Sequence, residues 1–156
     1  MLRGALRAGA KPILEAARAS APVATPSAEN QRLYGGRAGA LRDSLRISVK
    51  VKGGKVTASV KAGGIVKGGA DVYYARFVEY GTRAHKIDAA NGGFLGFANR
   101  FYKSVQHPGA KPRPFLRPAM DARATDAVVA AAEYIKNRLA TKHGIDTADI
   151  TIEVEQ

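Results

Sequence analysis

Two stretches in the first half of the chain alternate strictly between apolar and polar residues. The first runs from Leu45 to Val51 and the second from Val56 to Ala62, with Gly53-Gly54 in the turn between them. Alternation with a period of two is typical of a strand with one buried face, and a Gly-Gly turn between two such strands predicts a β-hairpin. We expect its apolar face to pack under helices and its outer face to be basic.

The first twenty residues have helical spacing instead. Leu2, Leu6 and Ile13 fall near one face of a helix over residues 2–20, and most of the charged residues fall on the other face. Pro12 is expected to kink this helix or to mark a restart within it, because proline lacks the backbone N–H that an interior turn uses.

A longer helix is predicted from Phe115 to about Lys142. Pro118 suits its first turn, and Gly144 suits a C-terminal cap. The larger apolar residues of this helix fall on one face, with alanines between them: Leu116, Met120, Val128, Ile135 and Leu139.

The other predicted elements are short. Strands are expected at His85–Asp88, Phe94–Phe97 and Phe101–Val105, and the alternation of Ile150–Val154 suits a last strand. Residues 72–78 fit either a helix or a strand.

Together these elements predict a single α+β domain, residues 1–156. In it, an antiparallel sheet of four to five strands packs against an N-terminal helix and a long C-terminal helix, and residues 147–156 form a strand-like end. Two segments rich in Gly, Pro and polar residues, 25–39 and 63–69, lack apolar periodicity. They are expected to be mobile in the free protein and to become ordered against neighbouring subunits.

Charge separates the two ends of the chain. The 156 residues carry a formal net charge of +12. Residues 1–113 hold 20 basic and 6 acidic side chains, a net +14, whereas residues 114–156 hold 5 basic and 7 acidic side chains, a net −2. This asymmetry indicates a partner of opposite sign, either nucleic acid or an acidic protein surface such as the other end of a neighbouring copy. The alternative is a basic face that only keeps the protein in solution.

The sequence contains no recognisable catalytic or metal site. It has no Cys, and His85, His107 and His143 have no partner at metal-ligand spacing. Nucleophile motifs and phosphate-binding glycine loops are also missing. We therefore expect no enzymatic activity, no cofactor and no metal. No apolar run has the length of a membrane span or of a signal peptide.

Basic side chains are concentrated on the predicted hairpin, where they are candidates for contact with a partner or with DNA. These are Arg46, Lys50, Lys52, Lys55 and Lys61. Contacts of this kind with phosphates are independent of sequence and weaken as salt is added.

Glu79 lies among apolar neighbours in an otherwise basic half of the chain. If it is buried, its carboxylate needs a donor, for which Arg42, Arg76 and Arg117 are candidates. If it is not buried, it points to water on the polar side.

An ordered set of short motifs extends over most of the chain. They are Ala21-Pro22-Val23-Ala24-Thr25, Leu41-Arg42-Asp43-Ser44, Tyr74 through Thr82, His107-Pro108-Gly109 and Pro114 through Ala119. The ordered set resembles the head–tail joining and tail-completion (neck) proteins of long-tailed bacteriophages. From Tyr74 onward, the residues that carry the resemblance are Tyr74, Phe77, Glu79, Gly81, Thr82, His107, Pro108, Gly109, Pro114, Phe115, Leu116 and Pro118.

The chain departs from the family pattern in one place. It inserts residues 26–38 ahead of Leu41-Arg42, and this insertion suits a contact loop specific to this subunit.

The resemblance implies a non-catalytic structural protein of the virion neck or upper tail. Proteins of this kind form rings around the DNA channel, here a hexamer or a dodecamer, and join the DNA-filled head to the tail. The implied partners are other copies of the chain, neighbouring neck and tail-tube or tail-terminator proteins, and, non-specifically, the DNA in the channel. Assembly in the host cytoplasm without a membrane is expected.

The alternatives within virion assembly are a tail terminator or a minor tail protein. Outside virion assembly, the alternative is a small basic DNA-binding module without sequence preference.

Overall fold

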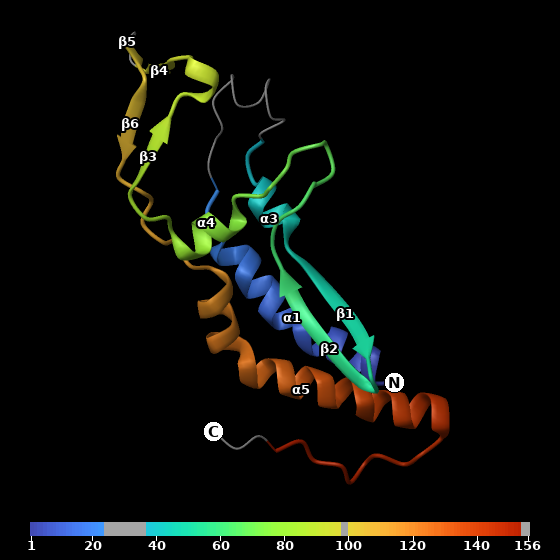
Figure 1. Cartoon of the computed structure of the whole chain (residues 1–156). Helices are drawn as coiled ribbons and strands as arrows, with labels where there is room; N and C mark the ends of the chain where they lie inside the picture. Colours follow the sequence, from blue (N-terminus) through green and yellow to red (C-terminus); the bar gives the residue numbers. More distant parts are fainter. Residues whose placement is uncertain (24–36, 98–99, 154–156) are drawn as a thin grey trace.

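The computed structural model describes residues 1–23, 37–97 and 100–153, and it confirms the α+β class (Figure 1). The described helices are α1 (Leu2–Ser20), α3 (Ala40–Ser44), α4 (Ala75–Tyr80), the short 3-10 helix η1 (Ala90–Gly92) and α5 (Leu116–His143). The described strands are β1 (Arg46–Lys52), β2 (Lys55–Lys61), β3 (His85–Asp88), β4 (Leu95–Phe97), β5 (Arg100–Tyr102) and β6 (Ser104–His107). The ambiguous residues 72–78 thus contribute to a helix, α4.

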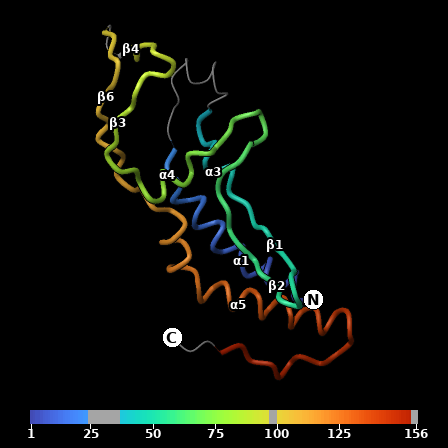
Figure 2. The backbone as a smooth tube through the Cα atoms, viewed as in Figure 1, coloured from blue at the N-terminus to red at the C-terminus, as the bar shows by residue number. Residues whose placement is uncertain are grey.

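Helices α1 and α5 pack against each other along much of their length (Figures 1 and 2). Their close approach depends on small residues. A Cβ atom at Gly9 would lie 2.6 Å from the carbonyl oxygen of Ala127 and 3.2 Å from the Cβ of Ala131. Ala127 and Ala131 of α5 therefore lie directly against α1 at this position. Helix α1 continues through Pro12 as one element, so the restart considered at that position does not occur.

Helix α5 is only partly covered. Among its residues, all of which the structure describes, only Ala119 is fully buried. Met120 and Val128, on the apolar face predicted from the sequence, are 54% and 56% exposed. The helix contains a kink at Arg123, with φ −124° and ψ 15°, and ends at Gly144 in the predicted left-handed conformation.

The predicted hairpin is confirmed. Strands β1 and β2 pair antiparallel, with Ile47 opposite Val60 and Val49 opposite Ala58 on the apolar face. Gly53 and Gly54 have φ angles of 55° and 75°, the left-handed conformations that a tight two-residue turn of this kind requires. The hairpin packs against α1, as expected from its apolar face.

The hydrophobic core lies where several elements meet near the middle of the molecule. Its largest fully buried side chains are Phe115 at the start of α5, Leu45 at the start of the hairpin, and Val72. The remaining buried members are small or come from the ends of α1 and α3: Ala17, Ala21, Ala40, Leu41, Ala70, Ala75 and Ala119. Phe115 therefore fixes the beginning of α5 at the centre of the fold.

The described strands do not form one continuous sheet. They form three two-stranded antiparallel sheets, β1–β2, β3–β6 and β4–β5. The second and third sheets belong to a projection, residues 82–110, here called the arm, which extends away from both long helices (Figure 1). Because none of the described helices covers the arm, its strands have no common apolar layer on which to join the hairpin.

Two sequence-based predictions need correction. The predicted strand Phe101–Val105 is divided between β5 and β6 at Lys103. No strand forms in the described part of the C-terminal segment, residues 144–153. There the Lys136 Nζ donates to the carbonyl oxygen of Ile150 at 2.8 Å, so the segment is fastened along α5 rather than along a strand edge.

The Gly-rich segment 63–69 forms a small loop. It is closed by a bridge between Ile65 and Asp71 and by a hydrogen bond from the Val66 N–H to the Ala70 carbonyl oxygen at 3.0 Å. The other segment that was expected to be mobile is 25–39, and its residues 25–36 lie outside the described residues. The mobility of both remains a prediction.

Candidate functional site

The carboxylate of Glu79 joins α4 to the start of α5. Glu79 is buried, with 6% of its surface exposed. Its Oε2 accepts hydrogen bonds from the backbone N–H groups of Phe115 and Leu116 at 2.8 and 3.0 Å, and its Oε1 accepts one from Arg117 at 3.1 Å. A helix leaves its first N–H groups without partners inside the helix, and the N-cap residue of α5 supplies no side-chain cap. Glu79 therefore caps α5 from outside that helix.

These donors correct one expectation and confirm another. Glu79 is buried, and it is paired, but its partners are backbone N–H groups rather than the guanidinium of Arg42, Arg76 or Arg117. A signal for this pairing was present in the sequence. Arg113-Pro114-Phe115 has none of the residues that cap a helix locally, so a helix starting there needs an acceptor from elsewhere.

The charge of Glu79 is stabilised by these contacts. Burial raises the pKa of the Glu79 carboxyl, but the three backbone hydrogen bonds and the Arg117 charge outweigh burial and hold the pKa below its ordinary value. Glu79 is thus a carboxylate at neutral pH, where it also interacts favourably with the positive end of the α5 dipole.

Gly81 and Gly109 bring the two ends of the arm into backbone contact. Gly81 has a φ of 71°, and a Cβ there would lie 2.5 Å from the carbonyl oxygen of Ala110. Gly109 has a φ of 84°, and a Cβ there would collide with the carbonyl oxygen of Thr82. The Thr82 N–H donates to the Ala110 carbonyl oxygen at 2.9 Å, and the Ala110 N–H donates to the Thr82 Oγ1 at 2.9 Å. Both glycines are needed for conformation and for space.

The contacts of Glu79 and of these two glycines form one unit, here called the joint, which connects α4, both ends of the arm and the start of α5. Most motif residues singled out from Tyr74 to Pro118 belong to the joint or to the core beside it. Phe115 is fully buried, Tyr74 and Leu116 pack on the core, and burial raises the pKa of the Tyr74 hydroxyl. The His107 ring accepts a backbone N–H within the 107–109 turn. The exposed members are Phe77, Pro108, Pro114 and Pro118.

The Leu41–Ser44 motif has a structural role of the same kind. Leu41 belongs to the core, and the hydroxyl of buried Ser44 donates to the Leu41 carbonyl oxygen at 2.7 Å. The Ser44 Oγ in turn accepts a hydrogen bond from the Gly63 N–H at 3.0 Å. Ser44 thereby connects α3, before the hairpin, to the loop that follows the hairpin.

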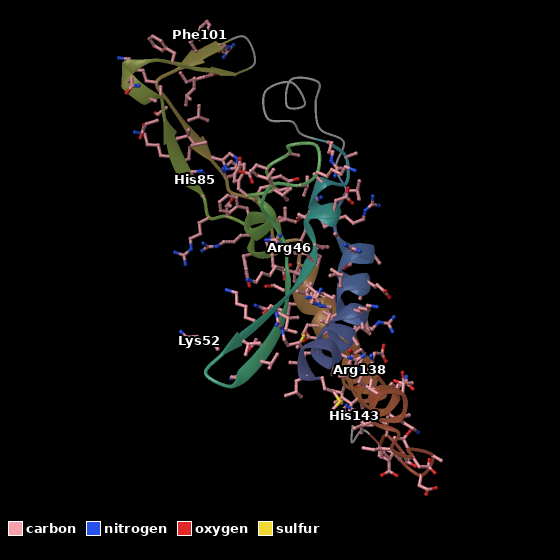
Figure 3. All side chains as sticks on the ribbon, turned by 90° about the vertical axis from the view of Figure 1, so that its right-hand side faces the viewer. Arg46, Lys52, His85, Phe101, Arg138 and His143 are labelled. Atoms are coloured by element: carbon pink, nitrogen blue, oxygen red, sulfur yellow. The ribbon has the colours of Figure 1, made fainter. Side chains whose placement is uncertain are left out.

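The predicted basic residues of the hairpin have two different settings. The Arg46 guanidinium donates to the carbonyl oxygens of Ser44 and Gly63 at 3.1 and 2.5 Å, so it fastens the base of the hairpin. Lys52 and Lys55 face each other at the tip and are exposed, and Figure 3 shows the hairpin extending from Arg46 to Lys52. Lys50 is exposed and Lys61 half-buried; within the described residues, no ion pair involves any of the hairpin's basic residues.

The arm exposes apolar side chains that sequence reasoning assigned to a buried sheet. Phe94 and Phe101 are 62% and 78% exposed, and Figure 3 shows Phe101 at the far end of the arm. His85 and His107 lie opposite each other on β3 and β6, with ring centroids 5.1 Å apart.

An apolar groove lies on the opposite side of the joint from the arm. Helix α1 forms its floor, β2 and α5 form its walls, and its volume is about 860 Å³. Leu6 and Ile13 contribute from α1, and Met120 and Val128 from α5; on β2 the consecutive residues Ala58, Ser59 and Val60 line it. The sequence indicated the apolar faces but not that they would remain partly uncovered.

Among the described residues, no group of three or more His, Cys, Asp or Glu side chains could hold a metal ion. None of the described helices combines the length and the apolar character needed to cross a membrane.

A protein-family model matches the first half of the chain. The family is described as "Bacteriophage HK97-gp10, putative tail-component", and the match extends over residues 1–81, just over half of the sequence. It includes α1, the hairpin and α4, and it ends at Gly81 in the joint. No curated protein and no solved structure matches the chain.

Proposed function

Since the chain belongs to the HK97-gp10-like family of bacteriophage tail components, we propose that it is a ring-forming subunit of the phage neck or upper tail. In this role it joins the DNA-filled head to the tail, without catalytic activity and without a cofactor. Its place is in the virion, among other structural proteins of the phage.

Family membership is the observation that carries this proposal, and the geometry of the joint supports it. Side chains and backbone groups of the joint hold the arm and the long helix α5 together at one point. Most of the motif residues therefore maintain the shape of the subunit, which suits a protein that acts by fitting against neighbours.

The uneven distribution of charge and of apolar surface supports a ring. The arm, the hairpin lysines and the groove belong to different parts of the molecule, and each is exposed. When the two surfaces that meet are different, copies associate head to tail, and such contacts close into a ring if the rotation between copies allows it. A hexamer or a dodecamer is the expected closed form.

A phage that lacks the gene for this protein tests the proposal. We expect filled heads and tails of normal length that fail to join stably, and we expect joining to be restored when purified protein is added. Electron microscopy of the particles and the infectious titre measure both effects. Tails of irregular length would support a tail terminator instead, and normal infectivity without the protein would contradict any essential part in assembly.

Contact with DNA is a second candidate for part of the function, and the exposed lysines at the hairpin tip favour it. Such binding would weaken steeply with salt, because each lysine that neutralises a phosphate releases a counterion. A gel shift of duplex DNA by the isolated protein at increasing salt tests it. A shift that persists in a form unable to form rings would favour the small DNA-binding module.

A further inference from the structure

The apolar groove between β2 and α5 is open along a strand edge. Three consecutive residues of β2, Ala58 to Val60, line the groove. Consecutive side chains of a strand point to opposite faces, so a groove lined by all three meets the strand edge-on. Strand β2 pairs only with β1 in the described part of the chain, so its other edge has backbone N–H and C=O groups available for a further strand.

The occupant of such a groove must combine a strand-like pattern with an apolar face. The C-terminal segment of this chain has both. Ile150, Ile152 and Val154 alternate with Thr151, Glu153 and Glu155 in the sequence. In the described structure this segment forms no strand, and Ile150 is 42% exposed. The segment therefore has the sequence pattern of a strand, but its described part does not pair with another strand.

The C-terminal segment and the hairpin beside the groove also carry charges of opposite sign. The segment 144–156 contains four acidic residues and no basic residue. The polar face of the hairpin carries Lys55 and Lys61 on β2 and Lys50 on β1, and no ion pair of the described residues uses them. A strand added to β2 with its isoleucines over the apolar floor would place its glutamates on the same side as these lysines. Cross-strand pairs of opposite charge stabilise a sheet and set its register.

The segment does not reach the groove of its own chain in this structure. It follows α5 and runs back along that helix, with α5 between it and the hairpin in Figure 1. The side chain of Thr147 is buried, which also fastens the segment there. In a second copy the segment is fastened in the same way, but α5 of that copy does not separate it from this groove.

We propose that the groove receives the C-terminal segment of a second copy, which adds from Ile150 onward as a strand along the free edge of β2. This deepens the proposed function and rests on it, because it names the two surfaces that would join neighbouring subunits of the ring. Strand addition supplies backbone hydrogen bonds for affinity, and the alternating side chains supply specificity.

Single cysteines test the contact, because the natural chain contains none. One batch of the full chain carries Ile152→Cys and a second, tagged batch carries Ala58→Cys, on the apolar face of β2, and the two are mixed and treated with a short thiol crosslinker. We expect a crosslinked heterodimer in several-fold greater yield than with the control Lys11→Cys, which is exposed on the outer side of α1. Equal yields at Ala58 and Lys11 would overturn the proposal.

Charge reversal gives a second measurement that does not depend on the groove being tolerant to substitution. Glu153→Lys with Glu155→Lys in the first batch should reduce the heterodimer several-fold, and so should Lys55→Glu with Lys61→Glu in the second. Combining the two reversed batches should restore it. Failure of the combination to recover the yield would overturn the proposed pairing.

Two further outcomes identify other arrangements. If a chain that carries both cysteines crosslinks internally while the mixed batches do not, the segment covers its own groove and the proposal is wrong. If the crosslink forms but phage without the protein assembles normally, the proposed contact is confirmed and the proposed neck function is wrong. If the crosslink does not form but deletion of the gene prevents the joining of heads to tails, only the proposed contact is wrong.

Discussion

Glu79 joins two helices that are far apart in the sequence, α4 and α5. Its carboxylate holds the first turn of α5, 36 positions further along the chain, by two hydrogen bonds at Oε2 and one at Oε1. Hydrogen bonds to an ionised acceptor are stronger than neutral ones, and burial prevents water from replacing them. The position of α5 relative to α4 therefore depends on one charge.

Replacing Glu79 by glutamine removes this charge and keeps the size of the side chain. We expect the free energy of unfolding to fall by about 1–3 kcal/mol, since backbone N–H groups lose an ionised acceptor. Chemical denaturation followed by circular dichroism measures the change. Glu15→Gln is the matched control, because Glu15 is exposed on α1 and its replacement should change stability by no more than about 0.5 kcal/mol. Equal effects at the two positions would contradict the role of Glu79.

Glu79 also predicts how stability depends on pH. Its pKa is lower in the folded protein than in the unfolded chain, so its contribution is fully present above the unfolded value of about 4.3 and is lost as pH falls through the lower folded value. A hydrogen bond from Arg37 lowers the pKa of Asp43, which acts in the same direction. The wild type should lose more stability than Glu79→Gln in acid, so the difference between them should shrink. A constant difference from neutral pH to strong acid would exclude this linkage.

At the scale of elements, the pairing of α1 with α5 depends on the absence of side chains. A Cβ at Gly9 would press on the carbonyl oxygen of Ala127, which is backbone and cannot move aside. Gly4 is close-packed in the same way, because the ring of Tyr134 fills the space that a Cβ would need. The missing side chains therefore allow the two helices to approach closely at these positions.

Gly9→Ala separates helix propensity from packing. Propensity alone predicts a gain of about 1 kcal/mol, because alanine favours a helix interior over glycine. Overpacking against α5 predicts a loss of about 1–3 kcal/mol, and we expect the loss to dominate. Urea denaturation gives the result, with Lys11→Ala on the exposed face of α1 as the control for substitutions in that helix. If the Gly9→Ala protein is more stable than the wild type, α5 can move away from α1 to make room for the added methyl group, and the expected loss is contradicted.

The hairpin is the element on which charge is expected to matter for assembly. Exposed ion pairs contribute only about 0–1 kcal/mol each, so apolar contacts must hold subunits together and charge mainly sets orientation. Changing Lys50, Lys52 and Lys55 to Glu should leave folding intact and reduce assembly or DNA retention at physiological salt. Particle yield and genome release after salt challenge measure the effect.

The control for this change is a reversal of equal size elsewhere. Arg3, Arg7 and Lys11 are exposed along α1, so changing all three to Glu alters the net charge by the same amount. If both variants assemble and retain DNA like the wild type, the hairpin is only a basic surface in contact with solvent. If both fail alike, net charge rather than the hairpin is responsible.

At the scale of the whole molecule, the arm is the part that lacks support of its own. Its two sheets have two strands each, and isolated pairs of this kind are marginally stable in water. All four residues of β3 are exposed, as are Phe94 and Phe101 beyond it. A subunit that maintains such a projection is expected to place it against a neighbour.

Hydrogen exchange tests this expectation. Backbone amides of residues 85–107 should exchange rapidly in the free chain and more slowly in assembled particles, because neighbours would cover the arm. The segments 25–39 and 63–69 are predicted to change in the same way. Mass spectrometry of peptides from both states measures the difference, with α1 as the internal reference. Equal protection in the two states would contradict ordering by neighbours.

The sequence by itself determined the local elements, and the reason lies in short-range chemistry. The alternation on both sides of Gly53-Gly54 and the left-handed turn it requires specify the hairpin without help from distant residues. The helical spacing of residues 2–20, and Gly144 at the end of α5, are local signals of the same kind. The ordered motifs likewise indicated the phage family, which the match over residues 1–81 bears out.

Only the tertiary structure decided which of these elements meet. Glu79 has backbone partners 36 to 38 positions away, and no local pattern could specify them. The strands expected in one sheet are divided among three, because a strand joins a sheet only where an apolar layer covers it, and none of the described helices covers the arm. The apolar face of α5 indicated a buried helix, yet Met120 and Val128 remain exposed beside the groove. Periodicity shows that a face must be covered, whereas the arrangement of the other elements determines whether this chain or a neighbour covers it.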